Sequence, residues 1–466
     1  MVQTFAPCAQ LTSARAVLFD ACQNRKRCYS WDVKTAFLNA VPDYTTFVHC
    51  PPGRQRQYAP DGTPLVYEFV YNCYGNPSAP RRWHCAIHNA LVRRGFKQSY
   101  TEPSLYTMVV NGVLLSTLLY TGDCMCTFDD TPAGVAAYTE FIDYIKSNFE
   151  LQDDGHQVCT DFIGMNISWG PDNSWVRIDQ PKFINNMLGE HGFAECRTQK
   201  TPAIPGVLLS TLDSPADDES GDADRSAMKG LPLRARVGSQ LWLARTSRPD
   251  LSHSVGALTR VVSKPGKAHW DASSYLMRYV AGTKSLGLTF HRDDSVLPGQ
   301  FKPTGYTDSD YAPDWGDKYM NYNSTTGWVF TLNGTAVSWR SRRQDRCAQS
   351  SSEAEWYAAA DAAKEAEHLR LLMLDLGNPI HGPIYLNADN QSAIKCSENT
   401  TNQEQQKHIS VRSHFLRQQV RRGVLKLQWV PGADNWSDQF TKPVPAPLLK
   451  RCRAGYGLME SVDTVG

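Results

Sequence analysis

Between Phe301 and Lys442 the chain reads, in order, Gly305-Tyr-Thr-Asp-Ser-Asp-Tyr-Ala312, Ser350-Ser-Ser-Glu-Ala-Glu-Trp-Tyr357, Asn387-Ala-Asp-Asn-Gln-Ser-Ala393 and Trp436-Ser-Asp-Gln439. Each segment holds one acid that we single out, namely Asp308, Glu355, Asp389 and Asp438. The apolar runs between the segments predict strands at residues 327–332 and 335–339, joined by an Asn-Gly turn, and at 383–387 and 424–430. Residues 350–376 predict a long helix with serine caps. We therefore expect the aspartates at or just beyond strand ends and the glutamate in the first helical turn.

The helix also indicates which of its two early glutamates matters. Positions 355, 359, 362, 366, 369, 373 and 376 follow steps of four and three and lie on one helix face, which reads Glu-Ala-Ala-Ala-Leu-Met-Leu. Glu355 thus heads an apolar stripe that should face a sheet, whereas Glu353 lies off that stripe. Burial of an acid there is unfavourable unless a cation meets it.

Four carboxylates that converge on one point suit a pair of divalent cations. Two Mg²⁺ ions roughly 4 Å apart, held by carboxylate oxygens, can activate water and stabilise the leaving oxygen in phosphodiester cleavage. The alternative is that the four acids are unrelated surface residues, and for any single one this is the better interpretation. The occurrence of all four in this strand–helix–strand order favours the metal site.

Length and composition indicate the class of protein. A chain of 466 residues is too long for one ordinary core, so two or three domains are expected. With 41% hydrophobic residues the chain is globular rather than disordered. It has no apolar run long enough to span a bilayer and no signal peptide, and its 13 cysteines follow no CxxC spacing. We therefore expect an intracellular protein, cytoplasmic or nuclear, that is not secreted.

Basic residues are clustered although the net charge is only +1. One cluster precedes the long helix and contains Arg340, Arg342 and Arg343, a second begins at Lys407, and a third lies within residues 234–248. A single basic cluster is usually just a solvated face. Three clusters beside an expected phosphodiesterase site favour contacts with a nucleic-acid backbone.

The N-terminal part, residues 1–205, mixes short strands and helices. Asp32 falls at the end of a short strand and is soon followed by Phe37. A hairpin with Asn111-Gly112 at its turn leads to Tyr120-Thr-Gly-Asp123. The acidic residues 213–224 read as loop or linker, and residues 231–287 as two or three helices.

The motifs of residues 301–445 resemble the ribonuclease H domain of copia-type retrotransposon polyproteins. The matching segments are Tyr306-Thr-Asp-Ser-Asp-Tyr-Ala312, Ala336-Val-Ser-Trp339, Ser351-Ser-Glu-Ala-Glu355, Ala388-Asp-Asn-Gln-Ser-Ala-Ile394, Lys407-His-Ile409, His414-Phe415 and Thr441-Lys-Pro443. The resemblance implies that Asp308, Glu355, Asp389 and Asp438 are catalytic and bind Mg²⁺, or Mn²⁺ in its place. The loop before Asp438 departs from many ribonucleases H because it lacks a histidine that helps product leave.

Residues 1–205 resemble the reverse transcriptase of the same family. The matches include Trp31-Asp-Val-Lys-Thr-Ala-Phe-Leu-Asn39, Pro51-Pro-Gly53, Tyr74-Gly75, Pro103-Ser-Leu-Tyr106 and Phe162-Ile-Gly164. The resemblance implies that Asp32 is a catalytic, metal-binding acid. It also places Phe37, which excludes a ribose 2′-hydroxyl, and Tyr74 at the nucleotide site.

Three departures predict a defective polymerase. The family has Tyr-X-Asp-Asp where this chain has Tyr120-Thr-Gly-Asp123, so Gly122 replaces a metal-binding carboxylate and Asp123 matches the less critical acid. Asn76-Pro-Ser78 replaces a leucine, a lysine and a glutamine beside the nucleotide pocket, and the chain opens inside the family's pattern, without the preceding fingers segment. Phe128-Asp129-Asp130 is interpreted as a solvated turn rather than a substitute acid.

The expected fold class is α/β, with an α+β palm, a helical thumb or connection, and a ribonuclease H-like mixed sheet with flanking helices. We expect five parts: residues 1–205 as N-terminally truncated fingers and palm, 206–230 as acidic linker, 231–300 as thumb or connection, 301–445 as the ribonuclease H-like domain, and 446–466 as a C-terminal tail.

The expected function is that of a retroelement reverse transcriptase–ribonuclease H with an intact nuclease site and a defective polymerase. Its expected partners are RNA–DNA hybrid, RNA template and DNA, bound partly by Arg340, Arg342, Arg343 and Lys407. No membrane is expected as a partner, and a homo-oligomer stays open. Two alternatives remain: a functional RNA-directed DNA polymerase, and a non-catalytic nucleic-acid-binding relic of a retrotransposon.

Overall fold

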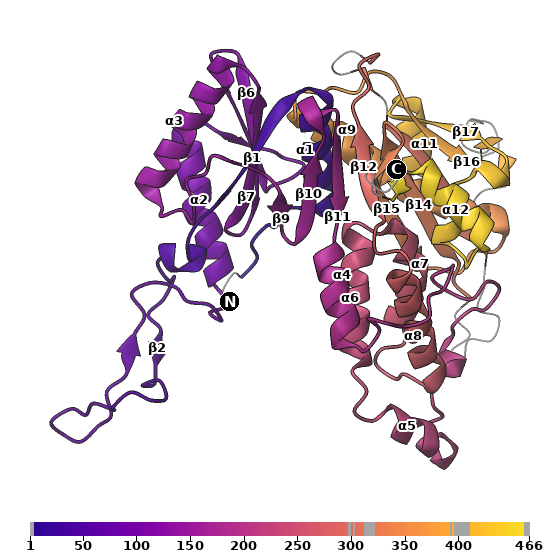
Figure 1. Cartoon of the computed structure of the whole chain (residues 1–466), viewed down its shortest axis with the longest axis horizontal. Coiled ribbons are helices and arrows are strands. Elements are labelled where there is room, and N and C mark those ends of the chain that lie inside the picture. The colour runs from indigo at the N-terminus through magenta and orange to yellow at the C-terminus, as the bar shows by residue number, and fades with distance from the viewer. Residues whose placement is uncertain are drawn as a thin grey trace. The chain divides into compact units, whose positions relative to one another are not determined.

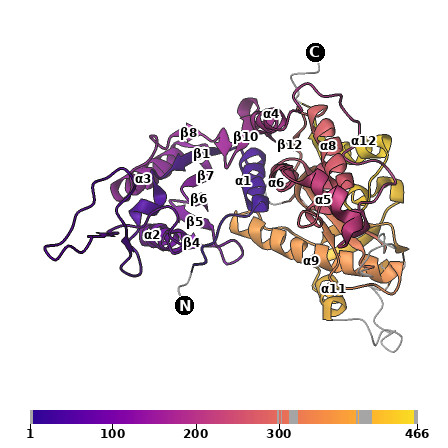
Figure 2. The same ribbon diagram turned by 90° about the horizontal axis from the view of Figure 1, so that it is seen from below.

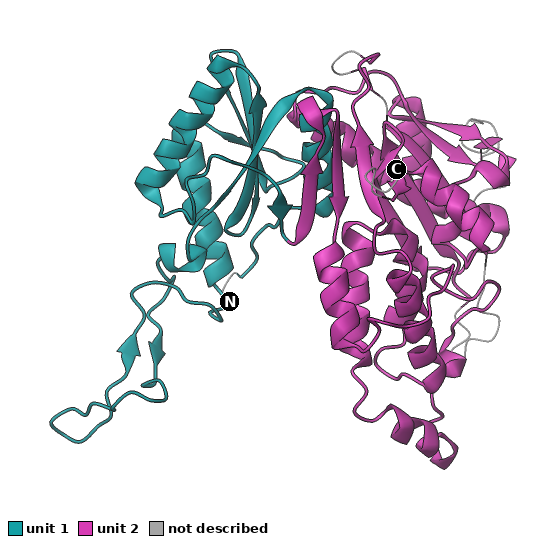
Figure 3. Cartoon of the chain, in the orientation of Figure 1, with its two compact units in different colours: residues 1–163 teal, residues 164–466 magenta. Residues whose placement is uncertain are grey.

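The computed structural model describes residues 4–296, 300–301, 303–311, 322–391, 394–395 and 411–460. The chain forms two compact units, residues 1–163 and 164–466 (Figure 3). In the described part of the chain no helix is long and apolar enough to cross a bilayer.

The first unit is built on an antiparallel sheet with the strand order β4-β5-β6-β7-β1-β8. Helices α2 and α3 lie on one side of this sheet and α1 lies on the other (Figures 1 and 2). A separate two-stranded hairpin is formed by β2 and β3. The bounds are α1 Leu11–Gln23, β1 Lys26–Asp32, β2 Phe47–Val48, β3 Tyr67–Glu68, α2 Ala79–Arg94, β4 Lys97–Gln98, β5 Leu105–Val110, β6 Val113–Tyr120, β7 Asp123–Asp129, α3 Pro132–Asn148, β8 Gln157–Val158 and β9 Asp161–Phe162.

In strands β5 to β7 of this sheet, one prediction from the sequence is confirmed and one is wrong. Asn111 and Gly112 both have positive φ, as the predicted two-residue turn between β5 and β6 requires. The interpretation of residues 128–130 as a solvated turn is wrong for Phe128 and Asp129. They belong to β7, which pairs with β1 and β6 on its two sides, and Phe128 is buried.

The second unit contains an antiparallel group of strands in the order β18-β12-β11-β10. Along the chain, β10 and β11 come before a group of helices, whereas β12 and β18 come after it. Apolar side chains of α4, α6, α7 and α8 pack together into a core. The segment expected as an acidic linker contains a helix, α5, and the expected C-terminal tail contains α12 and β18. The bounds are β10 Met165–Trp169, β11 Trp175–Asp179, α4 Pro181–Glu190, α5 Asp222–Met228, α6 Leu233–Thr246, α7 Ser252–Thr259, α8 Lys267–Ala281, β12 Gly287–His291, α12 Ala446–Gly455 and β18 Leu458–Met459.

A five-stranded mixed sheet follows in the second unit, with the order β15-β14-β13-β16-β17. Strands β13, β14 and β15 are antiparallel, whereas β16 runs parallel to both β13 and β17. The long helix α9 packs against β13 and β14, and α11 lies beside it (Figure 2). The bounds are β13 Thr304–Asp310, β14 Thr325–Leu332, β15 Thr335–Arg343, α9 Ser351–Asp375, β16 Ile384–Ala388, α11 Val411–Arg421 and β17 Leu425–Trp429. The predicted mixed sheet with flanking helices, and with it the fold class, is confirmed.

Ser350 caps the helix that carries the candidate glutamate. Its backbone is extended and its side-chain oxygen accepts a hydrogen bond of 3.2 Å from the N–H of Glu353. We expect Ser350→Ala to lower the free energy of unfolding by about 1 kcal/mol, because one N–H at the helix start loses its partner. Ser352→Ala, inside the first turn, should change it by less than about 0.5 kcal/mol. Denaturant unfolding compares the two variants, and equal midpoints would contradict the cap.

Candidate active site

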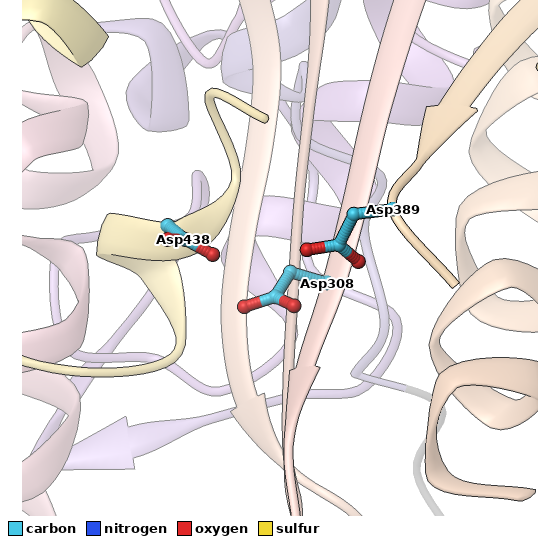
Figure 4. Close-up of side chains that lie close together, drawn as sticks. All are labelled: Asp308, Asp389 and Asp438. Carbon is cyan, nitrogen blue, oxygen red and sulfur yellow. The ribbon is translucent and has the colours of Figure 1, made fainter. Parts of the chain in front are cut away.

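Three aspartates from separate segments of the second unit lie close together at the mixed sheet. Asp308 lies in β13, Asp389 follows β16 directly, and Asp438 opens a 3-10 turn, Asp438–Phe440. One carboxylate oxygen of each lies within 4.8 Å of those of the other two, and the three side chains turn toward one another (Figure 4). The parallel register pairs Tyr306 with Asn387. Asp308 and Asp389, each two residues further on, therefore reach the same level of the sheet.

Only one of these aspartates occupies the kind of position that was predicted. Asp389 lies just beyond a strand end, but Asp308 lies inside β13, which stays paired with β14 through Asp310. Asp438 is on a turn because residues 432–440 fold back over the sheet after β17. The Asn435 side chain fixes this fold by donating to the carbonyl oxygen of Thr307 at 3.1 Å.

Glu355, the fourth predicted acid, is not part of this group of mutually close oxygens. It lies near enough for the charges of Asp308 and Asp389 to act on it, and it is 8% exposed. Its Oε1 accepts a hydrogen bond of 3.2 Å from the backbone N–H of Ser309, whereas its Oε2 is buried without a hydrogen-bond partner. Burial, with the charges of Asp308 and Asp389, raises the pKa of Glu355 to about 10. Glu353 instead accepts hydrogen bonds near the helix start, so the predicted distinction between the two glutamates is confirmed. We call Asp308, Glu355, Asp389 and Asp438 the carboxylate cage.

Two residues that the sequence did not single out complete the surroundings of the cage. The Thr441 hydroxyl donates to Asp308 Oδ2 at 2.5 Å. Lys442 Nζ lies 3.3 Å from Asp438 Oδ1 and 3.9 Å from Asp308 Oδ2. Gly327 leaves the room for this segment, since a Cβ there would lie 2.7 Å from Thr441 Cγ2. The only sequence signal for both residues was the segment Thr441-Lys-Pro443.

The residues of the cage fit a divalent cation. All four side chains offer hard oxygen ligands of the kind that Mg²⁺ prefers, and the buried Oε2 of Glu355 lacks any other partner. Burial followed by the charge of Asp308 raises the pKa of Asp438 to about 7, and the same two causes raise the pKa of Asp389. Each shift is the response of an acid that is buried and, to a lesser degree, crowded by other acids, and a bound cation would oppose it.

The second predicted site, in the first unit, is less complete. Asp32 is the last residue of β1 and lies directly across from Asp123, the first residue of β7. Asp123 Oδ2 accepts a hydrogen bond of 2.8 Å from the N–H of Ile163, and burial raises its pKa to about 6. A Cβ added at Gly122 would lie 2.9 Å from Asp32 Oδ1, so a side chain at that position would project toward Asp32. Within the part of the chain that the structure describes, the only three acidic, histidine or cysteine side chains with mutually close ligand atoms are those of Asp308, Asp389 and Asp438.

Comparison with known proteins gives one match to the N-terminal part of the chain and several matches to nearly all of it. Residues 1–205 match the family described as "Reverse transcriptase (RNA-dependent DNA polymerase)". The chain is 29% identical over 460 residues to the "Retrovirus-related Pol polyprotein from transposon TNT 1-94" of Nicotiana tabacum, with 98% of this chain and 33% of that protein covered. The chain belongs to the copia-type transposon Pol polyprotein family.

Other members of the Pol family give similar alignments. The polyprotein from transposon RE2 of Arabidopsis thaliana is 28% identical, with 100% of this chain and 30% of that protein covered. The chain therefore spans about a third of the length of these Pol polyproteins. A shorter relative, "Secreted RxLR effector protein 161" of Plasmopara viticola, is 40% identical over 139 residues, which are 30% of this chain and 92% of that protein.

Among the predicted nucleotide-site and nucleic-acid-binding residues, the structure brings one pair into contact. The rings of Phe37 and Tyr74 lie 4.9 Å apart between centroids, so the two predicted nucleotide-site residues touch. Arg340 and Arg342 lie on the exposed face of the edge strand β15, where they pair with Asp361 at 3.9 Å and Asp345 at 2.7 Å, and Arg343 is partly buried. These arginines belong to the strand itself, not to the connection before α9 as predicted. Lys407 lies outside the described residues.

The raised pKa of Asp438 predicts a pH dependence for the metal-free protein. An acid whose pKa is raised on folding holds a proton that the unfolded chain releases, so its contribution to stability falls as pH rises from about 4 toward the folded value, which is about 7 here. Asp438→Asn imitates the protonated acid. We expect its melting temperature, relative to that of the unmodified chain, to rise between pH 5 and pH 8.

Thermal unfolding in the presence of EDTA at several pH values measures this difference. The comparison removes the effects of groups that both proteins share, such as the buried His253. A difference that stays constant across the range would contradict the prediction. Saturating Mg²⁺ should reverse its sign at pH 8, because the cation then favours the charged carboxylate.

Proposed function

We propose that this chain cleaves the RNA strand of RNA–DNA hybrids by divalent-metal chemistry at the carboxylate cage. The observation that carries the proposal is the convergence of three aspartates within 4.8 Å, beside a buried glutamate with an unpartnered oxygen, in a member of the copia-type Pol family. The proposed metal ligands are the four acids of the cage, and the metal is Mg²⁺ or Mn²⁺.

Each part of the site has a separate task in this proposal. Bound Mg²⁺ would lower the pKa of the attacking water and offset the charge on the departing 3′-oxygen. The hydrogen bond from Thr441 fixes the orientation of the Asp308 carboxylate, and Asn435 fastens the turn that carries Asp438 to β13. Arg340, Arg342 and Arg343, together with Lys407, are proposed to contact the phosphates of the hybrid.

We also infer that the polymerase site of this chain is defective. Asp32 and Asp123 would both bind metal, but Gly122 supplies no ligand where a side chain would project toward Asp32. The contact between Phe37 and Tyr74 is consistent with a nucleotide site that persists without the full set of acids. The proposed activity is therefore cleavage without template-directed DNA synthesis.

Incubation of the full chain with an RNA–DNA hybrid labelled on the RNA strand, in the presence of Mg²⁺, tests the proposal. Cleavage of the RNA strand, none of the matching DNA duplex, and none in EDTA are the expected results. A chain that binds the hybrid without cutting it would be a non-catalytic nucleic-acid-binding protein instead. Primer extension on an RNA template tests the polymerase half in the same preparation.

A further inference from the structure

Lys442 is the one cation that pairs with the carboxylate cage in the described part of the chain. Its Nζ lies 3.3 Å from Asp438 Oδ1 and 3.9 Å from Asp308 Oδ2. The two acids are buried, with side chains that are 13% and 5% exposed, whereas the Lys442 side chain is 43% exposed. The ammonium therefore enters the cage from its solvent side.

An ammonium in this position would compete with a divalent cation for Asp308 and Asp438. The ammonium pairs with Asp308 Oδ2 and Asp438 Oδ1, and a cation held by these two acids would draw on the same carboxylates. The positive charges of the ammonium and of the cation would also repel each other, and more strongly at the lower effective dielectric near a protein surface than in water. A bound ion therefore favours departure of the ammonium.

The lysine side chain is suited to such a departure. It is a compact charge on a flexible four-carbon stem, and nearly half of its surface already contacts solvent. Thr441, the preceding residue, keeps its own hydrogen bond to Asp308, so the backbone can stay in place while the ammonium swings out.

We propose that Lys442 is the internal counter-ion of the cage: it holds Asp308 and Asp438 together when no divalent ion bridges them and competes with that ion for binding. The proposal rests on the proposed function, because it takes the cage as a metal site. Lys442 would then help to set the metal concentration at which the site fills. Before the site fills, it would reduce the repulsion between Asp308 and Asp438.

Calorimetric titration of the metal-free full chain with Mn²⁺ tests this competition directly. We expect Lys442→Met to bind Mn²⁺ at least about tenfold more tightly than the unmodified chain, because no ammonium has to be displaced. Lys442→Gln, which keeps a hydrogen-bond donor near Asp438, should tighten binding similarly and serves if the methionine variant does not fold. Lys364→Met is the control: this lysine pairs with Asp361 at 3.7 Å, outside the cage, and its removal should leave Mn²⁺ affinity unchanged.

The outcomes separate this proposal from the one on which it rests. Unchanged or weaker Mn²⁺ binding by both Lys442 variants, in a chain that binds Mn²⁺ and cleaves hybrid, would overturn the role of Lys442 alone. Failure of the unmodified chain and of all variants to bind Mn²⁺ would overturn the cage as a metal site and the proposed function with it. A lower melting temperature of Lys442→Met in EDTA, restored by Mn²⁺, would add support.

Discussion

Asp389→Asn should reduce cleavage of the RNA–DNA hybrid by at least about 10³-fold, because loss of one metal ligand costs several kcal/mol of transition-state stabilisation. Asparagine has nearly the same shape as aspartate but provides a neutral and weaker ligand. Asp389 follows β16 directly and its carboxylate faces Asp308 (Figure 4), so the fold should tolerate the change. The measurement is the initial rate of RNA cleavage in Mg²⁺, with the melting temperature as a check on folding.

The matched control for this variant is Asp434→Asn. Asp434 lies only four residues before Asp438, but it pairs with Arg451 at 2.8 Å, and both side chains are about half exposed. Its replacement should leave the cleavage rate unchanged. Full activity of Asp389→Asn would show that the reaction occurs at some other site or comes from a contaminant, and the carboxylate cage would lose its proposed role.

Gly122→Asp should strengthen divalent-cation binding in the first unit by adding a third carboxylate to Asp32 and Asp123. The new Cβ would lie 2.9 Å from Asp32 Oδ1 and 3.2 Å from the carbonyl oxygen of Val33. The first contact is with the end of a movable side chain, so a small rotation of Asp32 can relieve it. With a third carboxylate beside Asp32 and Asp123, we expect Mn²⁺ affinity at this site to rise on the order of 100-fold.

The variant is best measured in a chain whose carboxylate cage is silenced by Asp308→Asn and Asp389→Asn, so that Mn²⁺ titration reports the first unit alone. Gly122→Asn is the control, because it makes the same steric demand without the charge. Equal Mn²⁺ affinity of the two Gly122 variants would contradict the explanation that the added carboxylate charge strengthens metal binding. Robust template-directed extension by the unmodified chain would show that Gly122 does not disable the polymerase.

Local sequence patterns were sufficient for the elements of the mixed sheet and for one of its acids. The apolar stripe of α9 identified Glu355 rather than Glu353 because a helix repeats every 3.6 residues, and only one of the two glutamates falls on the buried face. Asn333-Gly334 located the turn between β14 and β15, since both residues must adopt positive φ there. Such features depend on neighbours within a few residues, and the sequence contains all of them.

The errors occurred where distant segments decide the local structure. Residues 128–130 were predicted to form a solvated turn, yet Phe128 and Asp129 extend β7, where they pair with Arg27 and Lys26 of β1. Asp438 was expected near a strand end, yet it lies on a turn fixed by hydrogen bonds to β13. Propensity is a weak guide at such positions because tertiary contacts supply the larger energies.

Sequence patterns and the order of the motifs predicted the fold class, the helix that carries Glu355, and which four acids to examine. How close these acids come follows only from the folded chain, as does the arrival of Thr441 and Lys442 from a segment more than 130 residues beyond Asp308. The spacing of apolar residues along a helix or strand shows which of its faces is buried. The distance between two charged side chains far apart in the sequence depends instead on how the whole chain between them folds. Lys442 beside Asp308 and Asp438 is a contact of this second kind, and no local pattern encodes it.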